Sequence, residues 1–329
     1  MTDFVQNDLS APPGFFHRAL MLLSIVVIMA SAMAAQDSDD VVRIDTELVS
    51  FEVTVTDKNG KLVPNLRRED FRLLEDGVER PIEFFQPIKK TEQGRPLTVV
   101  FALDVSGSMT EAEIGRLRSA MQIFISRLAD YDAYFAVISF AMDVRTLQQF
   151  TNQRERLERS FDRLLRDQDG LSTHAYDAVD DAVRLIARKS PKTIKGRLPK
   201  RAVILVSDGF PVGDVVSPDT LIERANAAET SVYSVILPSF SRLQGDKRPV
   251  LTPLEASGVI SKTGGKSFYA TDKSFDALFQ ALAEDITASY AIAVYPDEEA
   301  KRSGKPRRVT IQSRNGYTIR QNRTEYSAK

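Results

Sequence analysis

One segment of the chain combines side chains that are suited to holding a metal ion. Asp104, Ser106 and Ser108 alternate along the segment, and Asp104 is the last residue of the mostly apolar run LTVVFALD. A carboxylate and two hydroxyls are hard oxygen ligands, which suit Mg²⁺ or a similar cation better than zinc. Gly107 allows the backbone to turn tightly between them. This segment is therefore the first candidate for a metal site.

Two later segments carry the same kinds of side chain. Thr173 stands at the start of a predicted helix, and Asp208 follows the apolar run AVILVS within a Ser-Asp-Gly triplet. Ligands of a doubly wound sheet bind at the carboxyl ends of its strands, where all three segments are expected to lie. Two carboxylates and several hydroxyls leave one of the roughly six positions around Mg²⁺ open for a carboxylate from a partner.

The composition excludes several other kinds of site. The 329 residues contain no Cys and only two His, His17 and His174, so thiolate chemistry, disulfides and Cys-ligated zinc are excluded. The 44 basic and 45 acidic residues give a formal net charge of −1, which removes the electrostatic reason to expect nucleic-acid binding. The sequence also lacks a G-x-S-x-G elbow, an H-E-x-x-H motif and a P-loop,.

The elements that must position these residues alternate between apolar strands and amphipathic helices from Leu97 onward. This alternation predicts an α/β fold with a doubly wound, mostly parallel sheet and helices on both faces. We expect strands at residues 97–104, 134–140, 202–207, 232–237 and 266–270, with an edge strand at 144–150. Helices are expected at residues 111–128, 173–189, 221–228, 254–262 and 275–286.

Both flanks of this region have the period-two pattern of half-buried strands. Such strands are predicted at residues 49–56, 71–73 and 82–84, and again at 290–296, 308–313 and 317–322,. Neither flank can bury a sheet face by itself, so we expect them to combine into a small β-sandwich-like unit. The expected division is an N-terminal β-domain at 36–92, the α/β domain at 93–288 and C-terminal strands at 289–329.

The N-terminus has the features of a secretory signal peptide. Residues 19–36 carry no charge, Arg18 precedes them, and Ala32-Met33-Ala34 offers small residues for cleavage,. We therefore expect residues 1–35 to be removed and the mature protein to be secreted or periplasmic, without a membrane span. An uncleaved N-terminal anchor is the alternative, because about 18 uncharged residues can just span a bilayer.

Three motifs in this order resemble the von Willebrand factor type A family: D-x-S-x-S from Asp104, T-x-x-Y-D-A from Thr173, and S-D-G around Asp208. The resemblance spans residues 97–288 and implies a metal-ion-dependent adhesion site. Direct or water-mediated contacts to Mg²⁺, with Mn²⁺ or Ca²⁺ as alternatives, are implied for Asp104, Ser106, Ser108, Thr173 and Asp208. The flanks are similar to the secreted bacterial VWFA-related Acidobacterial proteins. This resemblance implies the arrangement of the domains but says little about the biochemical function.

The predicted function is a non-enzymatic module that captures an Asp or Glu carboxylate of a partner protein through the bound cation. One alternative is a hydrolase that uses the metal, or Ser106 or Ser108 as nucleophile with His174 as the base. Another is a structural scaffold with a vestigial metal site. The basic run at residues 188–201 is interpreted as a solvated connector,.

Overall fold

The computed structural model describes residues 48–87, 95–107, 110–164, 172–237, 251–270 and 275–328. The predicted signal peptide at residues 1–35 and the predicted ligand Ser108 lie outside them. None of the helices in these ranges is both long and apolar enough to cross a membrane.

A six-stranded sheet forms the centre of the α/β region, in the order β10-β9-β8-β5-β6-β7. Five strands run parallel, and the edge strand β7 is antiparallel to β6. The predicted doubly wound fold and its edge strand are thereby confirmed. The strands are β5 (Leu97–Asp104), β6 (Ala133–Phe140), β7 (Val144–Thr151), β8 (Lys200–Ser207), β9 (Thr230–Ile236) and β10 (Ser267–Tyr269).

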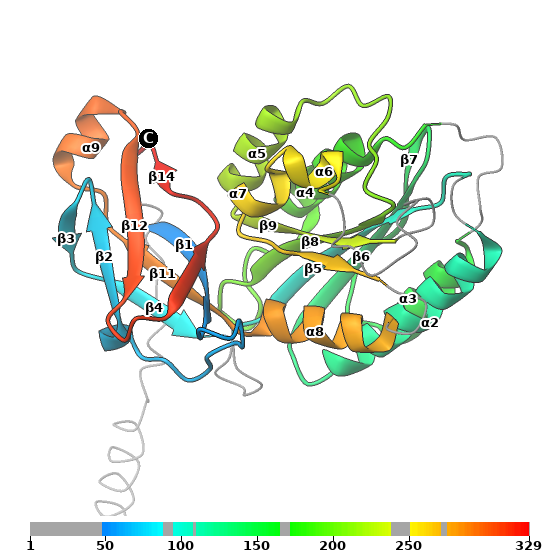
Figure 1. Cartoon of the computed structure of the whole chain (residues 1–329), viewed down its shortest axis with the longest axis horizontal. Coiled ribbons are helices and arrows are strands. Elements are labelled where there is room, and N and C mark those ends of the chain that lie inside the picture. The colour runs from blue at the N-terminus through cyan, green and yellow to red at the C-terminus, as the bar shows by residue number, and fades with distance from the viewer. Residues whose placement is uncertain are drawn as a thin grey trace, which may run out of the picture. The chain divides into compact units, whose positions relative to one another are not determined.

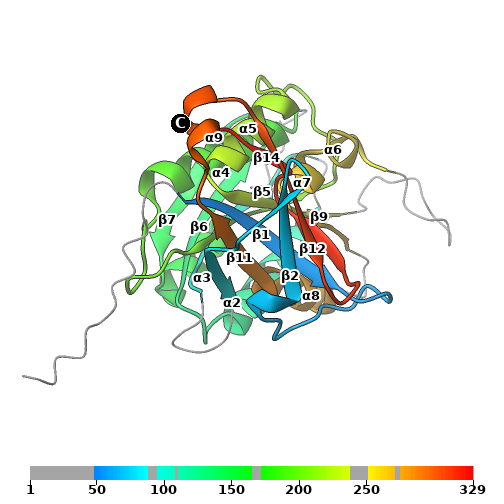
Figure 2. The ribbon, with the colours of Figure 1, turned by 90° about the vertical axis from the view of Figure 1, so that its left-hand side faces the viewer.

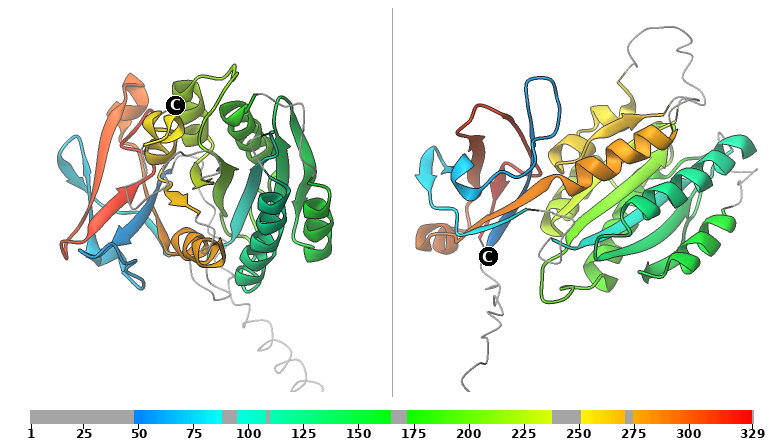
Figure 3. Two further views of the ribbon diagram at one scale, coloured as in Figure 1. Left: turned by 45° about the vertical axis from the view of Figure 1, so that its right-hand side comes forward. Right: turned by 90° about the horizontal axis from the view of Figure 1, so that it is seen from below.

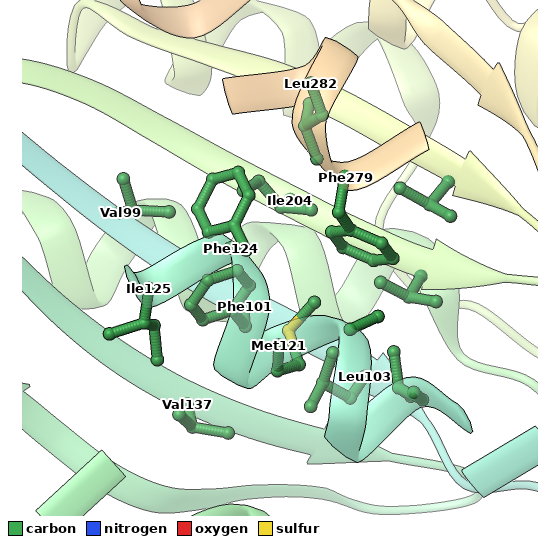
Figure 4. Packing of buried hydrophobic residues seen from close by; sticks show 14 of the residues in the cluster. Val99, Phe101, Leu103, Met121, Phe124, Ile125, Val137, Ile204, Phe279 and Leu282 are labelled. Carbon is green, nitrogen blue, oxygen red and sulfur yellow. The ribbon is translucent and has the colours of Figure 1, made fainter. Parts of the chain in front are cut away.

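Helices cover both faces of this sheet because its central strands are apolar on both sides. Every residue of β5 is buried, and alternate side chains point to opposite faces. Val99, Phe101 and Leu103 pack on one face against α2, α3 and α8, as Figure 4 shows for α2 and α8. Val100 and Ala102 pack on the other face against α4, α5, α6 and α7. In Figure 1 the first group of helices lies below the sheet and the second above it.

Most helices begin and end where the sequence predicts, with differences that have local causes. The helices are α2 (Glu111–Arg127), α3 (Arg154–Asp162), α4 (Ala175–Lys189), α5 (Pro218–Ala227), α6 (Pro253–Ala256), α7 (Val259–Lys262) and α8 (Phe275–Thr287). The single helix expected at residues 254–262 is wrong, since Gly258 at φ +79° separates α6 from α7,. Helix α5 begins three residues early because Ser217 caps it and Pro218 starts it,. Helix α3 was not predicted; it lies on the same sheet face as α2 and α8 (Figure 3).

The strands of the two flanks interleave in two four-stranded antiparallel sheets, as the predicted fold class requires. Their orders are β13-β1-β11-β4 and β14-β12-β2-β3, and Figure 2 shows blue N-terminal strands beside orange and red C-terminal ones. Val49 of β1 pairs with Val294 of β11. The elements are β1 (Val49–Thr56), β2 (Phe71–Glu75), β3 (Val78–Arg80), β4 (Phe84–Pro87), β11 (Ser289–Val294), α9 (Glu298–Ser303), β12 (Arg307–Ser313), β13 (Thr318–Gln321) and β14 (Glu325–Tyr326).

The two sheets share an apolar core that draws on both ends of the chain. Phe51 and Leu73 from the N-terminal flank pack with Ile292 and Val309 from the C-terminal one. The strand predicted at residues 82–84 lies later, as β4 at Phe84–Pro87. Helix α9, which was not predicted, begins after the capping residue Asp297.

A buried lysine lies where β8 begins, at the end of the sheet opposite the predicted metal site. Lys200 is 1% exposed, and its Nζ donates to the hydroxyls of Ser289 and Tyr233. The interpretation of residues 188–201 as a solvated connector is therefore wrong at its end, because residue 200 is the first residue of an internal strand.

Two ion pairs lie around this lysine and join the flanking strands to the α/β region. Arg95 pairs with Glu52 of β1, and Arg320 of β13 pairs with Asp285 of α8. The two carboxylates raise the pKa of Lys200 by their charge, but burial outweighs them and lowers it to about 8.

Candidate metal centre

Four of the five predicted site residues are described, and all four lie at the carboxyl edge of the parallel sheet. Asp104 is the last residue of β5 and Ser106 follows two positions later, whereas Asp208 comes directly after β8. Strands β5 and β8 are neighbours in register, so these loops leave the sheet side by side. Thr173 precedes α4. The location of Ser108 is not described.

Asp104 has a buried carboxylate that is only half satisfied. The side chain is 0% exposed, and its Oδ1 accepts a hydrogen bond of 2.9 Å from the backbone N–H of Ser106. Its Oδ2 is buried and has no hydrogen-bond partner among the described residues. Burial raises the pKa of Asp104 to about 6, and the charge of Asp208 adds to the rise. A buried carboxylate oxygen without a donor is a group that a cation would stabilise.

Two hydroxyls from distant parts of the sequence meet beside this carboxylate. The Oγ1 of Thr173 donates to the Oγ of Ser106 at 3.3 Å, across 67 residues of sequence. Both residues are buried, at 7% and 1% exposure respectively. The two hydroxyl oxygens, which could each coordinate a metal ion, are thereby held next to Asp104.

Asp208 is held in place by the turn that follows it. Its Oδ1 accepts a hydrogen bond of 3.0 Å from the backbone N–H of Phe210. The residue between them, Gly209, has φ +86°, and a Cβ there would lie 2.9 Å from Cγ2 of Thr252. Both observations require glycine at this position. The glycine of the S-D-G motif is thus required by the backbone turn, and the aspartate supplies the carboxylate.

The loop that continues from Asp208 is fastened to the start of α4. Thr173 and Val212 exchange two backbone hydrogen bonds, of 3.0 and 3.1 Å. Asp177 accepts hydrogen bonds from the backbone N–H groups of Val215 and Val216. Asp177 belongs to the T-x-x-Y-D-A motif but was not among the predicted site residues. Its function is to hold the loop after β8 against the segment that presents Thr173.

His174 is turned toward the loop after β8. Its Nδ1 lies 3.2 Å from Oδ2 of Asp177, and its Nε2 would lie 2.8 Å from a Cβ at Gly213. The side chain is 22% exposed. The only histidine after the predicted cleavage site is therefore engaged with the loop after β8.

The donor set fits a hard divalent cation. Asp104, Ser106, Thr173 and Asp208 offer only oxygen atoms, with two carboxylates to balance two positive charges. No cluster of three or more His, Cys, Asp or Glu residues that could hold a metal occurs in the described ranges. The unpartnered Oδ2 of Asp104 is the most direct sign that a ligand belongs here.

Comparison with known proteins identifies one family. A sequence model of the von Willebrand factor type A domain matches residues 98–284. No curated protein matches the chain by sequence.

The chain is also similar to solved structures at low sequence identity. An aerotolerance-related membrane protein from Bacteroides fragilis has 15% identity and a TM-score of 0.45, with 58% of this chain and 98% of that one covered. The vWF domain of the type V pili tip protein Mfa5 from Porphyromonas gingivalis has 14% identity and a TM-score of 0.43, with 58% and 95% covered. Proximal thread matrix protein 1 from the mussel byssus, with a zinc occupied MIDAS motif, has 15% identity and a TM-score of 0.45, with 60% and 47% covered. The family assignment rests on the family model, not on these likenesses.

Proposed function

The chain belongs to the von Willebrand factor type A domain family, and on that premise we propose that it binds a partner protein through a divalent cation. Domains of this family are usually binding modules and not enzymes. The observation that carries the proposal is the buried Oδ2 of Asp104, which has no hydrogen-bond partner in the described ranges.

The residues proposed to hold the cation are Asp104, Ser106, Ser108, Thr173 and Asp208. Mg²⁺ is the proposed cation because every donor is a carboxylate or hydroxyl oxygen, and Mn²⁺ or Ca²⁺ could take its place. A divalent cation bound there would supply a positive centre for an Asp or Glu carboxylate of the partner. Asp208 is partly exposed, so the proposed site is accessible from solvent at this residue.

A hydrolase is disfavoured by the surroundings of Ser106. Its Oγ accepts from Thr173, and His174 faces Asp177, so the base that a serine nucleophile needs is directed elsewhere. A scaffold with a vestigial site is disfavoured because it would not keep Asp104 buried at an energetic cost.

We also propose that the protein is exported and that its parts have the predicted limits. Residues 1–35 would act as the signal peptide. The α/β domain would span residues 93–288, between an N-terminal β-domain at 36–92 and C-terminal strands at 289–329. The pairing of β1 with β11 supports this division, because it joins the two flanks outside the six-stranded sheet.

Calorimetric titration with Mg²⁺ and Mn²⁺ tests the proposed site. The wild-type protein should bind one ion, and bound metal should raise its melting temperature, since any ligand selective for the native state stabilises it. Asp104→Asn and Asp208→Asn should lose both effects. Asp143→Asn is the matched control, because Asp143 is an exposed carboxylate (75% exposed) in the loop after the neighbouring strand β6. Equal binding of metal by the wild type and Asp104→Asn would refute the proposal.

A further inference from the structure

Exposed apolar side chains are concentrated around the candidate metal centre. Eight large hydrophobic side chains are exposed within the described ranges. Five of them lie in loops at the carboxyl edge of the six-stranded sheet, and we call these five the apolar collar: Met142 (54% exposed), Phe210 (44%), Val212 (53%), Val215 (88%) and Leu251 (64%). A concentration of exposed apolar side chains in the loops around one site is typical of a binding surface.

Three residues of the apolar collar are linked to the loops of the metal centre by backbone hydrogen bonds. Phe210 donates to Asp208, and Val212 pairs with Thr173. Val215 donates to Asp177. These hydrogen bonds hold the exposed side chains at fixed places relative to the proposed ligands, so the surface is pre-formed.

The remaining two residues reach the centre through their neighbours in sequence. Met142 follows Ala141, whose carbonyl accepts from the backbone N–H of His174 at 3.1 Å. Leu251 precedes Thr252, the residue that packs against the turn at Gly209. Met142 and Leu251 are therefore each one residue away in sequence from a residue that contacts the loops of the proposed ligands.

The apolar collar flanks the metal centre on two sides. In the order β9-β8-β5-β6, Asp104 ends the inner strand β5. Met142 follows β6 on one side of it, whereas Phe210 follows β8 on the other, and Leu251 adjoins Thr252, which packs against Gly209. A carboxylate bound at the centre would therefore have apolar surface on both sides.

Several charged groups of this rim have partners, whereas the buried Oδ2 of Asp214 has none among the described residues. Arg145 lies 3.4 Å from Asp143, and Asp177 is satisfied by backbone N–H groups. Apolar contact would add to the affinity that the metal provides, and it would exclude water from the carboxylate, which strengthens the electrostatic attraction.

We propose that the apolar collar selects partners in which one Asp or Glu lies between aliphatic or aromatic residues of an extended segment. This inference rests on the proposed function, because the acidic residue is the one that the metal centre captures. Its new content is the chemistry of the residues on either side.

A displayed peptide library with one fixed central Asp and randomised neighbours tests the specificity. Selection on the wild-type protein in Mg²⁺ should enrich aliphatic and aromatic residues beside the Asp, and EDTA should release the selected peptides. Their synthetic versions should bind the triple variant Met142→Ser/Phe210→Ser/Leu251→Ser about tenfold or more weakly, from the loss of three apolar contacts. Calorimetry with Mn²⁺ should show that the triple variant still binds metal.

The matched control is Val78→Ser/Tyr295→Ser, which removes two exposed apolar side chains, one in β3 and one directly after β11, and should bind the peptides like the wild type. Selection of Asp peptides without any preference at the neighbouring positions would overturn the inference and leave the proposed function intact. Failure to select any Mg²⁺-dependent peptide would overturn the proposed carboxylate capture, and the inference with it.

Two alternative ligands of the apolar collar, a lipid surface and a second copy of this chain, can be distinguished by experiment. Binding to phosphatidylglycerol vesicles that is lost in the triple variant would make the collar a lipid-binding surface. Self-association that is lost in the triple variant, measured by sedimentation, would make it an interface between copies of this chain. Either result without peptide selection would overturn the inference.

Discussion

Replacing Lys200 by Met should change how the stability of the protein depends on pH. Lys200 is fully buried, and its pKa of about 8 in the folded protein compares with 10.5 for an unperturbed lysine. Between these two values the unfolded chain binds more protons than the native state. The free energy of unfolding of the wild type therefore rises as pH increases through this window.

The magnitude follows from the difference between the two pKa values. Each unit corresponds to about 1.4 kcal/mol, so the charged form of Lys200 destabilises the native state by about 3 kcal/mol near neutral pH, relative to the neutral form. Lys200→Met removes this penalty but also the hydrogen bonds to Ser289 and Tyr233, worth about 1 kcal/mol each. At pH 7 the two proteins should thus be of similar stability. Between pH 7 and pH 10 the free energy of unfolding of the wild type should rise by about 2–3 kcal/mol relative to that of Lys200→Met.

Urea denaturation followed by circular dichroism at pH 7 and pH 10 measures this double difference. Groups that titrate equally in both proteins cancel, and burial raises the pKa of the adjacent Tyr233, so that its hydroxyl stays protonated. Lys192→Met serves as the control for the loss of one lysine charge from an exposed site of the same segment. A difference between wild type and Lys200→Met that stays constant between the two pH values would refute the reasoning.

The remaining predictions concern the ion pairs and the loops of the metal centre. Gly209→Ala should destabilise the protein by about 2–3 kcal/mol in urea denaturation, because alanine would have to adopt a positive φ and its Cβ would clash with Thr252,. An unchanged denaturation midpoint would contradict this. Arg320→Met should destabilise it by about 2–4 kcal/mol, since the Asp285 carboxylate (4% exposed) loses its cation,. Adding Asp285→Asn should recover much of that loss, and a double variant as unstable as the single one would contradict the account. Asp177→Ala should weaken Mg²⁺ binding several-fold in calorimetry and increase proteolysis of the loop after β8, because two backbone N–H groups lose their acceptor,; unchanged affinity and cleavage would contradict it.

The sequence by itself determined the architecture of the central sheet and the places of its functional loops. The run from Leu97 to Asp104 is apolar at nearly every position, and such a strand is stable only between two layers of helices. An Asp-Gly pair favours a tight hairpin turn, and Asp76 and Gly77 both have positive φ, 49° and 86°, between β2 and β3. Local patterns of this kind are readable because the residues that cause the structure are also neighbours in sequence.

Local signals were also present where the predicted elements were wrong. Ser217 and Pro218 mark the start of α5, and Gly258 marks the break between α6 and α7. Short elements were harder to predict because periodicity needs several turns to become visible.

Only the tertiary structure decided which side chains meet and what surrounds them. The hydroxyls of Ser106 and Thr173 are 67 residues apart and come together because β5 and the start of α4 lie at one edge of the sheet. Lys200 belongs to a basic run, yet it is buried because its strand begins inside the molecule, next to Ser289. The apolar collar could not be recognised either, since exposure depends on what the rest of the chain covers, and sequence shows only that these residues are apolar.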